Sequence, residues 1–264
     1  MLRLEQISKL FNEATPDEKV ALDKINLSLE KGDFVTIIGS NGAGKSTLMN
    51  MISGVLTPDV GKIYIDQKDV TKLPEFKRSK LIGRVFQDPM AGTAPSMTIE
   101  ENLAMAYSRN KTRGLRKGVD KNRKEFFIES LKTLHLNLEK RLNAKVGLLS
   151  GGERQALSLL MSTFTKPSIL LLDEHTAALD PSRAKLITSL TKELVEKDQL
   201  TTIMVTHNMQ QALDLGNRLI MMDNGQIILE VKEEEKKKLT IEQLLKEFQK
   251  LRGGSMISDR TLLA

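Results

Sequence analysis

Nine consecutive residues near the start of the chain, Gly39 to Thr47, read GSNGAGKST and have the composition of a phosphate-binding loop. Glycines let such a loop curl until its backbone N–H groups face an anion, and the helix that follows adds its positive N-terminal end. In this pattern Lys45 reaches the β- and γ-phosphates of ATP, Ser46 offers a hydroxyl to Mg²⁺, and Thr47 donates to a phosphate oxygen. The expected nucleotide-binding set is Gly39, Ser40, Asn41, Gly42, Ala43, Gly44, Lys45, Ser46 and Thr47.

Two adjacent carboxylates end the apolar run ILLLDE, Ile169 to Glu174. Ligands of α/β sheets bind at the carboxyl ends of the strands, so Asp173 is the candidate ligand for the metal. Glu174 lies next to it and is the candidate to orient or deprotonate the attacking water. A solvated, inert acidic pair is the alternative, and it would be preferred if no phosphate loop were present.

Gln87 in VFQDP and His207 in VTHNM each follow an apolar, β-rich segment. A glutamine there can contact Mg²⁺ and the lytic water, and a histidine can hydrogen-bond the γ-phosphate. Alone, each would more often be structural, but together with the loop and the carboxylates they favour a catalytic site. His135, in KTLHLNL, is expected to lie on a helix with a structural role.

A second glycine-rich turn lies about a hundred residues after the first, in LLSGGERQAL, Leu148 to Leu157. Ser150 offers a hydroxyl, Gly151 and Gly152 allow close backbone approach, and the helix that follows would direct its N-terminus at an anion. The alternative is a helix N-cap followed by flexible glycines.

The elements that must position these residues indicate an α/β fold. LRLEQISKLF and VALDKINLSLEKGD alternate apolar and polar residues and predict antiparallel strands joined by a turn near Pro16. FVTIIGS, SILLLDE and TTIMVTH predict buried strands of a mainly parallel sheet with crossover helices. RLIMMDNGQIILEV predicts a hairpin that turns at Asn224-Gly225.

Helical periodicity replaces the strand pattern between about residues 95 and 145. TIEENLAMAYS, with a capping box from Thr98 to Glu101, and KEFFIESLKTLHL predict helices of a subdomain inserted into the core. LTIEQLLKEFQKL predicts an amphipathic helix with a box from Thr240 to Gln243. The charged run KEEEKKK is expected to be exposed, and the end, RGGSMISDRTLLA, to be frayed. We therefore expect a core domain over 1–231 and a C-terminal helix and tail over 232–264.

Composition narrows the functional classes. The chain has 264 residues, a net charge of +6 and no cysteine, which excludes disulfides and thiolate metal sites. Nucleic-acid binding is not favoured, because the densest basic run, Arg109 to Lys124, contains no aromatic residue that could stack on bases. No apolar run approaches the roughly 20 residues that a membrane-spanning helix needs. The cytoplasm is the expected compartment.

Taken in order, the motifs resemble those of the nucleotide-binding subunits of ATP-binding cassette (ABC) transporters. GSNGAGKST resembles the phosphate loop, VFQDP the Q-loop, LSGGERQ the signature, ILLLDE the Walker B strand, AALD the D-loop and VTH the switch histidine. The resemblance implies that two subunits sandwich two ATP molecules head to tail, with the signature of one covering the phosphate loop of the other. It also implies that Phe11 stacks on adenine and that Asp180 contacts the opposite subunit. A role for Phe11 in the strand core is the alternative.

Two positions depart from the family pattern: His175 stands where proline is usual, and Glu153 where glutamine is frequent. Neither removes a catalytic group, so ATP hydrolysis is still expected.

The resemblance implies several partners: a second ATPase subunit that forms a homodimer with the first, separate membrane permease subunits and an external solute-binding protein. Such a chain would be peripheral on the inner face of the cell membrane. QDPMAGTAPSMTIEENLAMA is similar to importer ATPases for amino acids, including aromatic ones such as tryptophan. The rivals are a soluble cassette ATPase acting on nucleic acid, the ribosome or cofactor assembly, and a scaffold that binds ATP without hydrolysing it. An intact Glu174 and His207 argue against the scaffold.

Overall fold

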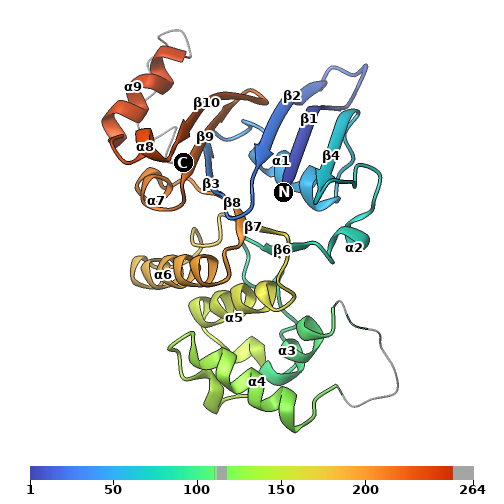
Figure 1. The fold of residues 1–264 in the computed structure, drawn as a ribbon, viewed down its shortest axis with the longest axis vertical. Coiled ribbons are helices and arrows are strands. Elements are labelled where there is room, and N and C mark those ends of the chain that lie inside the picture. The colour runs from blue at the N-terminus through green and yellow to red at the C-terminus, as the bar shows by residue number, and fades with distance from the viewer. Residues whose placement is uncertain (110, 112–117, 252–264) are drawn as a thin grey trace. The chain divides into compact units, whose positions relative to one another are not determined.

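The computed structural model describes residues 1–109, 111 and 118–251. The chain forms two compact units, one of Met1–Leu81 with Leu200–Ala264 and one of Ile82–Gln199 (Figure 1). We call them the first and second unit. The C-terminal tail predicted to be frayed, and part of the basic run, lie outside the described residues. The domain boundary at 231 stays a prediction.

An antiparallel sheet of the first unit contains the N-terminal strands. Its order is β2-β1-β4-β5, with β1 at Leu2–Phe11, β2 at Lys19–Leu29, β4 at Val60–Ile65 and β5 at Lys68–Asp69. Leu2 pairs with Leu29 at one end of β1, and Phe11 with Lys19 at the other. The predicted hairpin therefore forms, and alternate residues such as Leu2 and Leu4 point into the core.

The strands that carry the phosphate loop lie in a second sheet. Within the first unit β10 (Gln226–Lys232), β9 (Arg218–Asp223), β3 (Phe34–Gly39) and β8 (Thr201–Val205) lie side by side in that order. β3 pairs in parallel with both β8 and β9, and all its residues are buried, as its apolar composition predicts. The hairpin turns at Asn224 and Gly225, whose φ values are 45° and 77°, the geometry expected of Asn-Gly.

Helices of the first unit complete its core. They are α1 (Lys45–Ser53), α2 (Glu75–Arg78), α7 (Met209–Asp214), α8 (Glu233–Lys236) and α9 (Ile241–Leu251). The predicted capping box of α9 is present, since Thr240 Oγ1 accepts from Gln243 N and Gln243 Oε1 accepts from Thr240 N. Leu244 and Phe248 of α9 are fully buried in an apolar cluster with residues of β3, α7, β9 and β10.

The second unit contains two parallel strands, β6 (Ile82–Val85) and β7 (Ile169–Asp173), and a set of helices. The helices are α3 (Ile99–Tyr107), α4 (Lys121–Lys132), η1 (Leu138–Lys140), η2 (Val146–Leu148), α5 (Gly151–Thr163) and α6 (Pro181–Asp198). Thr98 and Glu101 form the predicted capping box. A bridge between Thr98 and Lys145 joins the two ends of the inserted helical segment.

Two expectations were wrong. The helix over KEFFIESLKTLHL ends at Lys132, and His135 has a left-handed backbone with a φ of 55°, so it lies in a turn and not on a helix. The run KEEEKKK is not wholly exposed: Lys236 is only 3% exposed, and backbone carbonyls that accept hydrogen bonds from its ammonium group offset the cost of burying the charge.

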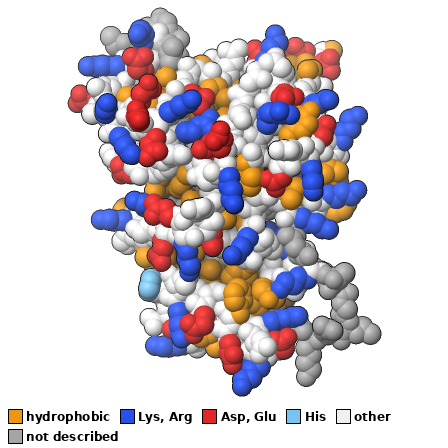
Figure 2. Space-filling model, in the orientation of Figure 1, with side chains coloured by type: hydrophobic (Ala, Val, Ile, Leu, Met, Phe, Trp, Pro, Cys, Tyr) orange, Lys and Arg blue, Asp and Glu red, His pale blue; other side chains and the backbone are white. Residues whose placement is uncertain are grey.

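Two further features are the distribution of surface charge and the hydropathy of the helices. Lys and Arg side chains are interspersed with Asp and Glu on the face seen in Figure 2. Among the described residues, no helix is long and apolar enough to cross a membrane.

Candidate functional site

The predicted nucleotide-binding residues are divided between the two units. The first unit holds Phe11, the loop from Gly39 to Thr47, and His207. The second unit holds Gln87, Ser150, Gly151, Gly152, Asp173, Glu174 and Asp180. Each half is built by its own set of contacts.

Backbone geometry gives the loop from Gly39 to Thr47 the curl that an anion cradle needs. Gly39, Gly42 and Gly44 all have positive φ values, of 155°, 83° and 98°. A Cβ on Gly39 would lie 2.2 Å from the carbonyl oxygen of Met222, and one on Gly44 would lie 2.5 Å from that of Ala21. Both positions therefore require glycine on steric grounds as well as conformational ones.

Lys45, the cation of this loop, is buried, with 5% of its surface exposed. Its ammonium group donates to the carbonyl oxygens of Gly39 at 2.7 Å and Ser40 at 3.0 Å. The β9–β10 turn braces the same loop, since Gly225 N donates to Ala43 O and Ser40 Oγ to Asp223 Oδ1. The charge is thus held along the inner side of the curl, at the base of the cradle.

Two basic residues that the sequence analysis did not select support this loop. Arg78 is fully buried and donates to the carbonyl oxygens of Met51 and Ile52, which fixes the C-terminal end of α1. Lys19, the strand partner of Phe11, places its ammonium 3.4 Å from the point that a Cβ on Gly42 would occupy. Lys19 therefore adds positive charge at the cradle and brings Phe11 to the same end of the sheet.

His207 follows β8 and precedes Asn208, the N-cap of α7. The Asn208 side chain accepts from Gln211 N at 2.9 Å, and Thr206 Oγ1 donates to Gln211 Oε1 at 2.7 Å. His207 and Gly39 line the same small cavity of about 10 Å³. The switch-histidine candidate thus lies beside the start of the phosphate loop.

In the second unit, an ion pair holds the Asp173 carboxylate. Arg84 Nη2 on β6 lies 3.1 Å from Asp173 Oδ2, and their side chains are 12% and 16% exposed. Glu174 follows with a φ of 44°, a left-handed conformation that costs a non-glycine residue roughly 1 kcal/mol or more. Such an outlier at the end of a buried strand is consistent with a functional residue held in a fixed direction.

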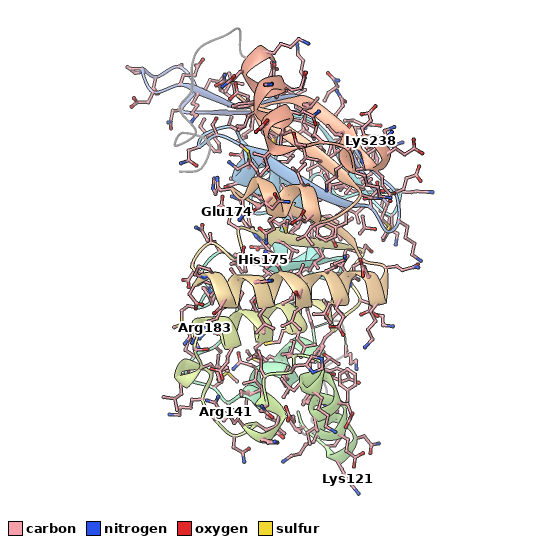
Figure 3. All side chains as sticks on the ribbon, turned by 90° about the vertical axis from the view of Figure 1, so that its left-hand side faces the viewer. Lys121, Arg141, Glu174, His175, Arg183 and Lys238 are labelled. Carbon is pink, nitrogen blue, oxygen red and sulfur yellow. The ribbon has the colours of Figure 1, made fainter. Side chains whose placement is uncertain are left out.

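His175 anchors the chain directly after Glu174. Its Nε2 lies 2.9 Å from Thr191 Oγ1 on α6, and Thr191 donates its own proton to Ile187 O. His175 Nε2 must therefore be the donor to Thr191. Burial lowers the pKa of His175 to about 4, so the ring is neutral near neutral pH. Figure 3 shows His175 between the end of β7 and α6. Its hydrogen bond to Thr191 holds the segment that follows β7 against α6.

The second glycine turn begins α5 with a complete capping box. Ser150 Oγ accepts from Glu153 N at 3.3 Å, and Glu153 Oε2 accepts from Ser150 N at 2.7 Å. Because the hydroxyl oxygen only accepts there, its proton can be donated to an anion. A Cβ on Gly152 would lie 3.0 Å from Arg183 Cδ, whereas one on Gly151 would make an ordinary contact with Leu179.

Glu153, the residue found where the family often has glutamine, has a clear role in the structure. Its carboxylate completes the capping box and pairs with Arg141 at 2.7 Å. Burial alone would raise the pKa of Glu153, but the hydrogen bonds from Ser150 and the charge of Arg141 lower it below its usual value. The carboxylate is thus kept ionised, and it stabilises the N-terminus of α5.

Gln155, also in the signature helix, is a residue that the sequence analysis quoted without assigning it a role. It is fully buried, and its Nε2 donates to the carbonyl oxygen of Phe86 at 3.1 Å. Phe86 directly precedes Gln87, so the signature helix and the Q-loop are joined by a hydrogen bond. Asp180, by contrast, is exposed and caps α6 by accepting from Arg183 N.

The residues proposed for the metal offer a hydroxyl, a carboxylate and an amide oxygen, which are the hard ligands that Mg²⁺ prefers. In the described part of the chain no three His, Cys, Asp or Glu residues are grouped to hold a metal by themselves. Mg²⁺ bound together with nucleotide phosphates usually needs only one or two protein carboxylates. The donor set therefore fits Mg²⁺ brought in with ATP.

A comparison with models of protein families shows to which family the chain belongs. The ABC transporter family model matches residues 22–177, more than half of the chain. The chain belongs to the ABC transporter family. It is 45% identical over 251 residues to a tyrosine transport ATP-binding protein of Clostridioides difficile (strain R20291), covering 94% of this chain and 99% of that protein.

Solved structures agree with this assignment for our ABC ATPase. A nucleotide-free cassette of an ABC transporter matches with a TM-score of 0.77 and 30% identity, covering 98% of this chain and 99% of the other. A dimeric cassette in a post-hydrolysis state, bound to ADP and Pi, matches with a TM-score of 0.75 and 33% identity, covering 88% and 98%. The chain is thus an ATP-hydrolysing subunit of a transporter, as its motifs predict.

Proposed function

We propose that this ABC ATPase powers the import of an aromatic amino acid of the tyrosine type through separate permease subunits. The observation that carries the solute class is the 45% identity to the tyrosine transport ATP-binding protein over nearly the full length of both chains. Relatives named for sulfate/thiosulfate, at 36% identity, and for glycine betaine/carnitine/choline, at 32%, are less similar. The solute itself would contact the other subunits.

In the proposed mechanism each residue has one role. The glycine-rich cradle and Lys45 hold the β- and γ-phosphates, and Phe11 stacks on adenine, with Lys19 beside the cradle. Ser46, Gln87 and Asp173 would hold Mg²⁺, which when bound neutralises phosphate charge. Glu174 orients the attacking water and takes up its proton, while His207 donates a hydrogen bond to the γ-phosphate.

Completion of the site requires two copies of the chain. Ser150, Gly151 and Gly152 of one copy cover the γ-phosphate held by the cradle of the other, and Asp180 contacts the partner. The dimeric solved relative supports this arrangement. The Ser150 hydroxyl is suited to this contact. Its oxygen accepts a hydrogen bond from Glu153 N, so its proton can be donated to a phosphate oxygen. Such an interface is isologous, so the same two-chain contact occurs twice. When the two chains close on ATP, both ATP sites are therefore completed together.

The partners that follow are a permease spanning the membrane and, outside the cell, a solute-binding protein. The ATPase would lie in the cytoplasm on the inner face of the cell membrane. Hydrolysis and permease movement would be linked through the Q-loop. Gln155 in the signature helix donates a hydrogen bond to the carbonyl oxygen of Phe86, the residue before Gln87. Closure on ATP would then move both segments together.

Affinity purification of the tagged chain from native membranes tests the transport assignment. We expect a multispanning permease to be recovered with it, whereas ribosomes or nucleic acid alone would contradict the proposal. Reconstitution into vesicles then tests the solute. Tyrosine should stimulate ATP hydrolysis and be taken up, while sulfate and betaine should do neither, and the opposite order would overturn the solute class alone.

A further inference from the structure

The C-terminal segment Glu233–Leu251 has no part in the mechanism above. It comprises α8 and α9 and lies beyond residues 22–177 that the family model matches. Both helices nevertheless pack against the described core of the first unit, as the side-by-side position of α7, α8 and α9 in Figure 1 shows. Among their contacts, those with the two ends of α7 bear on the site, because α7 directly follows His207.

Lys236 on α8 holds the C-terminal end of α7. Its ammonium group donates to the carbonyl oxygen of Leu215, to that of Gly216 at 3.1 Å and to Thr36 Oγ1 at 3.4 Å. The side chain is almost fully buried. A buried cation that binds consecutive carbonyls fixes the chain that leaves α7, because any displacement would leave the charge without its hydrogen bonds.

Phe248 on α9 lies at the other end of α7. It is fully buried and lines the cavity of about 10 Å³ that His207 and Gly39 also line. A cavity of this size has room for about one water molecule. The remaining lining is mainly apolar, with side chains of Ile38, Met209 and Met221. Phe248, His207 and the start of the phosphate loop thus share one small space, and removal of the Phe248 ring would widen it beside His207.

We propose that Phe248 is a positioning residue for His207, and that the C-terminal segment holds the switch histidine through α7. Lys236 holds the end of α7, Asn208 caps its beginning, and Phe248 lines the cavity beside His207. The segment thereby reduces the range of positions open to the imidazole. The inference rests on the proposed role of His207 in hydrolysis.

A matched pair of variants of the full chain tests this role. Phe248→Ala removes the ring at the cavity, and Leu244→Ala removes a fully buried side chain one turn earlier in the same apolar cluster that does not line the cavity. Both should lower the melting temperature. Only Phe248→Ala should lower kcat, by about tenfold or more, with a change in KM for ATP of less than about threefold.

The imidazole NMR signals of His207 give a readout independent of activity. The chain has three histidines, so a His207→Gln variant assigns the signal. Phe248→Ala should shift or broaden it, Leu244→Ala should leave it near its wild-type position, and Phe248→Leu should restore most of kcat and of the shift. If Phe248→Ala does not unfold cooperatively, Phe248→Leu takes its place in the comparison with Leu244→Ala. Phe248→Leu should then lower kcat and shift the His207 signal by less than Phe248→Ala would, and Leu244→Ala should change neither.

Equal effects of the Phe248 and Leu244 variants on kcat and on the His207 signal would overturn the inference and leave α9 a purely structural helix. The His207→Gln variant separates this outcome from failure of the proposed function. If it hydrolyses ATP normally, the role of His207 is wrong; if it is inactive while the Phe248 and Leu244 variants match, only the positioning role is wrong.

Discussion

Arg84 and Asp173 form an ion pair 3.1 Å apart between the parallel strands β6 and β7. The carboxylate proposed to hold the metal is therefore already paired with a guanidinium. Arg84 also lies over the Phe86 ring, 4.8 Å from its centre, so the same side chain touches the residue before Gln87. If Asp173 holds Mg²⁺ as proposed, we expect the metal to compete with this arginine for the carboxylate.

Arg84→Met should destabilise the chain more in the absence of nucleotide than in its presence. Loss of one partner from a largely buried pair costs about 3 kcal/mol, and Mg²⁺ with ATP should recover part of it by taking the place of the guanidinium. Urea denaturation with and without Mg-ATP measures both values. Arg3→Met, which breaks the exposed pair with Glu5, is the control and should cost less than about 1 kcal/mol. An equal loss for Arg84→Met under both conditions would argue against the competition.

Glu174→Gln should bind ATP and hydrolyse it more slowly by two or more orders of magnitude, if about 3 kcal/mol of transition-state stabilisation is lost. The dimer with bound ATP should then accumulate, which size-exclusion chromatography detects. Glu193→Gln, on the exposed face of α6, is the matched control and should hydrolyse ATP at the normal rate. Near-normal turnover by Glu174→Gln would refute its role.

Lys236 should give the stability of the protein a distinctive dependence on pH. Burial lowers the pKa of Lys236 from 10.5 to about 8 in the folded chain. Between pH 8 and 10.5 the unfolded chain therefore binds more protons, so this residue makes the free energy of unfolding rise with pH. The rise is up to about 3 kcal/mol. Below pH 8 both states are protonated, and the cost of burying the charge is present in full.

Urea denaturation of the wild type and Lys236→Met across this range isolates the effect. All other residues are the same in both chains, so the difference between the two curves reports Lys236. That difference should move in favour of the wild type as pH rises from 8. Parallel curves would show that Lys236 keeps an ordinary pKa.

Local patterns predicted most of the secondary structure. The buried strand before the phosphate loop, the Asn224-Gly225 turn and the capping boxes at Thr98 and Thr240 depend on neighbouring residues, and all are present. The end of α4 at Lys132 was missed, because a left-handed turn at His135 interrupts a periodic run whose composition alone does not end the helix.

Contacts between distant residues could not be predicted in the same way. Arg84 and Asp173 are 89 residues apart, Gln155 and Phe86 are 69 apart, and Lys236 reaches Leu215 across 21 residues. Each depends on which strands and helices become neighbours, and nothing in KEEEKKK distinguishes the one buried lysine from the exposed ones. The motifs thus predicted the candidate site residues, whereas the residues that hold them in place could be found only in the folded structure.

The dimer site is tested most directly by mixing two inactive variants, Lys45→Ala and Gly152→Asp. Each variant alone should not hydrolyse ATP, because one lacks the phosphate-loop cation and the other places a carboxylate where the partner's γ-phosphate should lie. In a mixed dimer, one site combines the intact loop of one chain with the intact signature of the other. An equimolar mixture should therefore recover about a quarter of the wild-type rate if chains exchange at random. A mixture no more active than its two components would contradict the two-chain site.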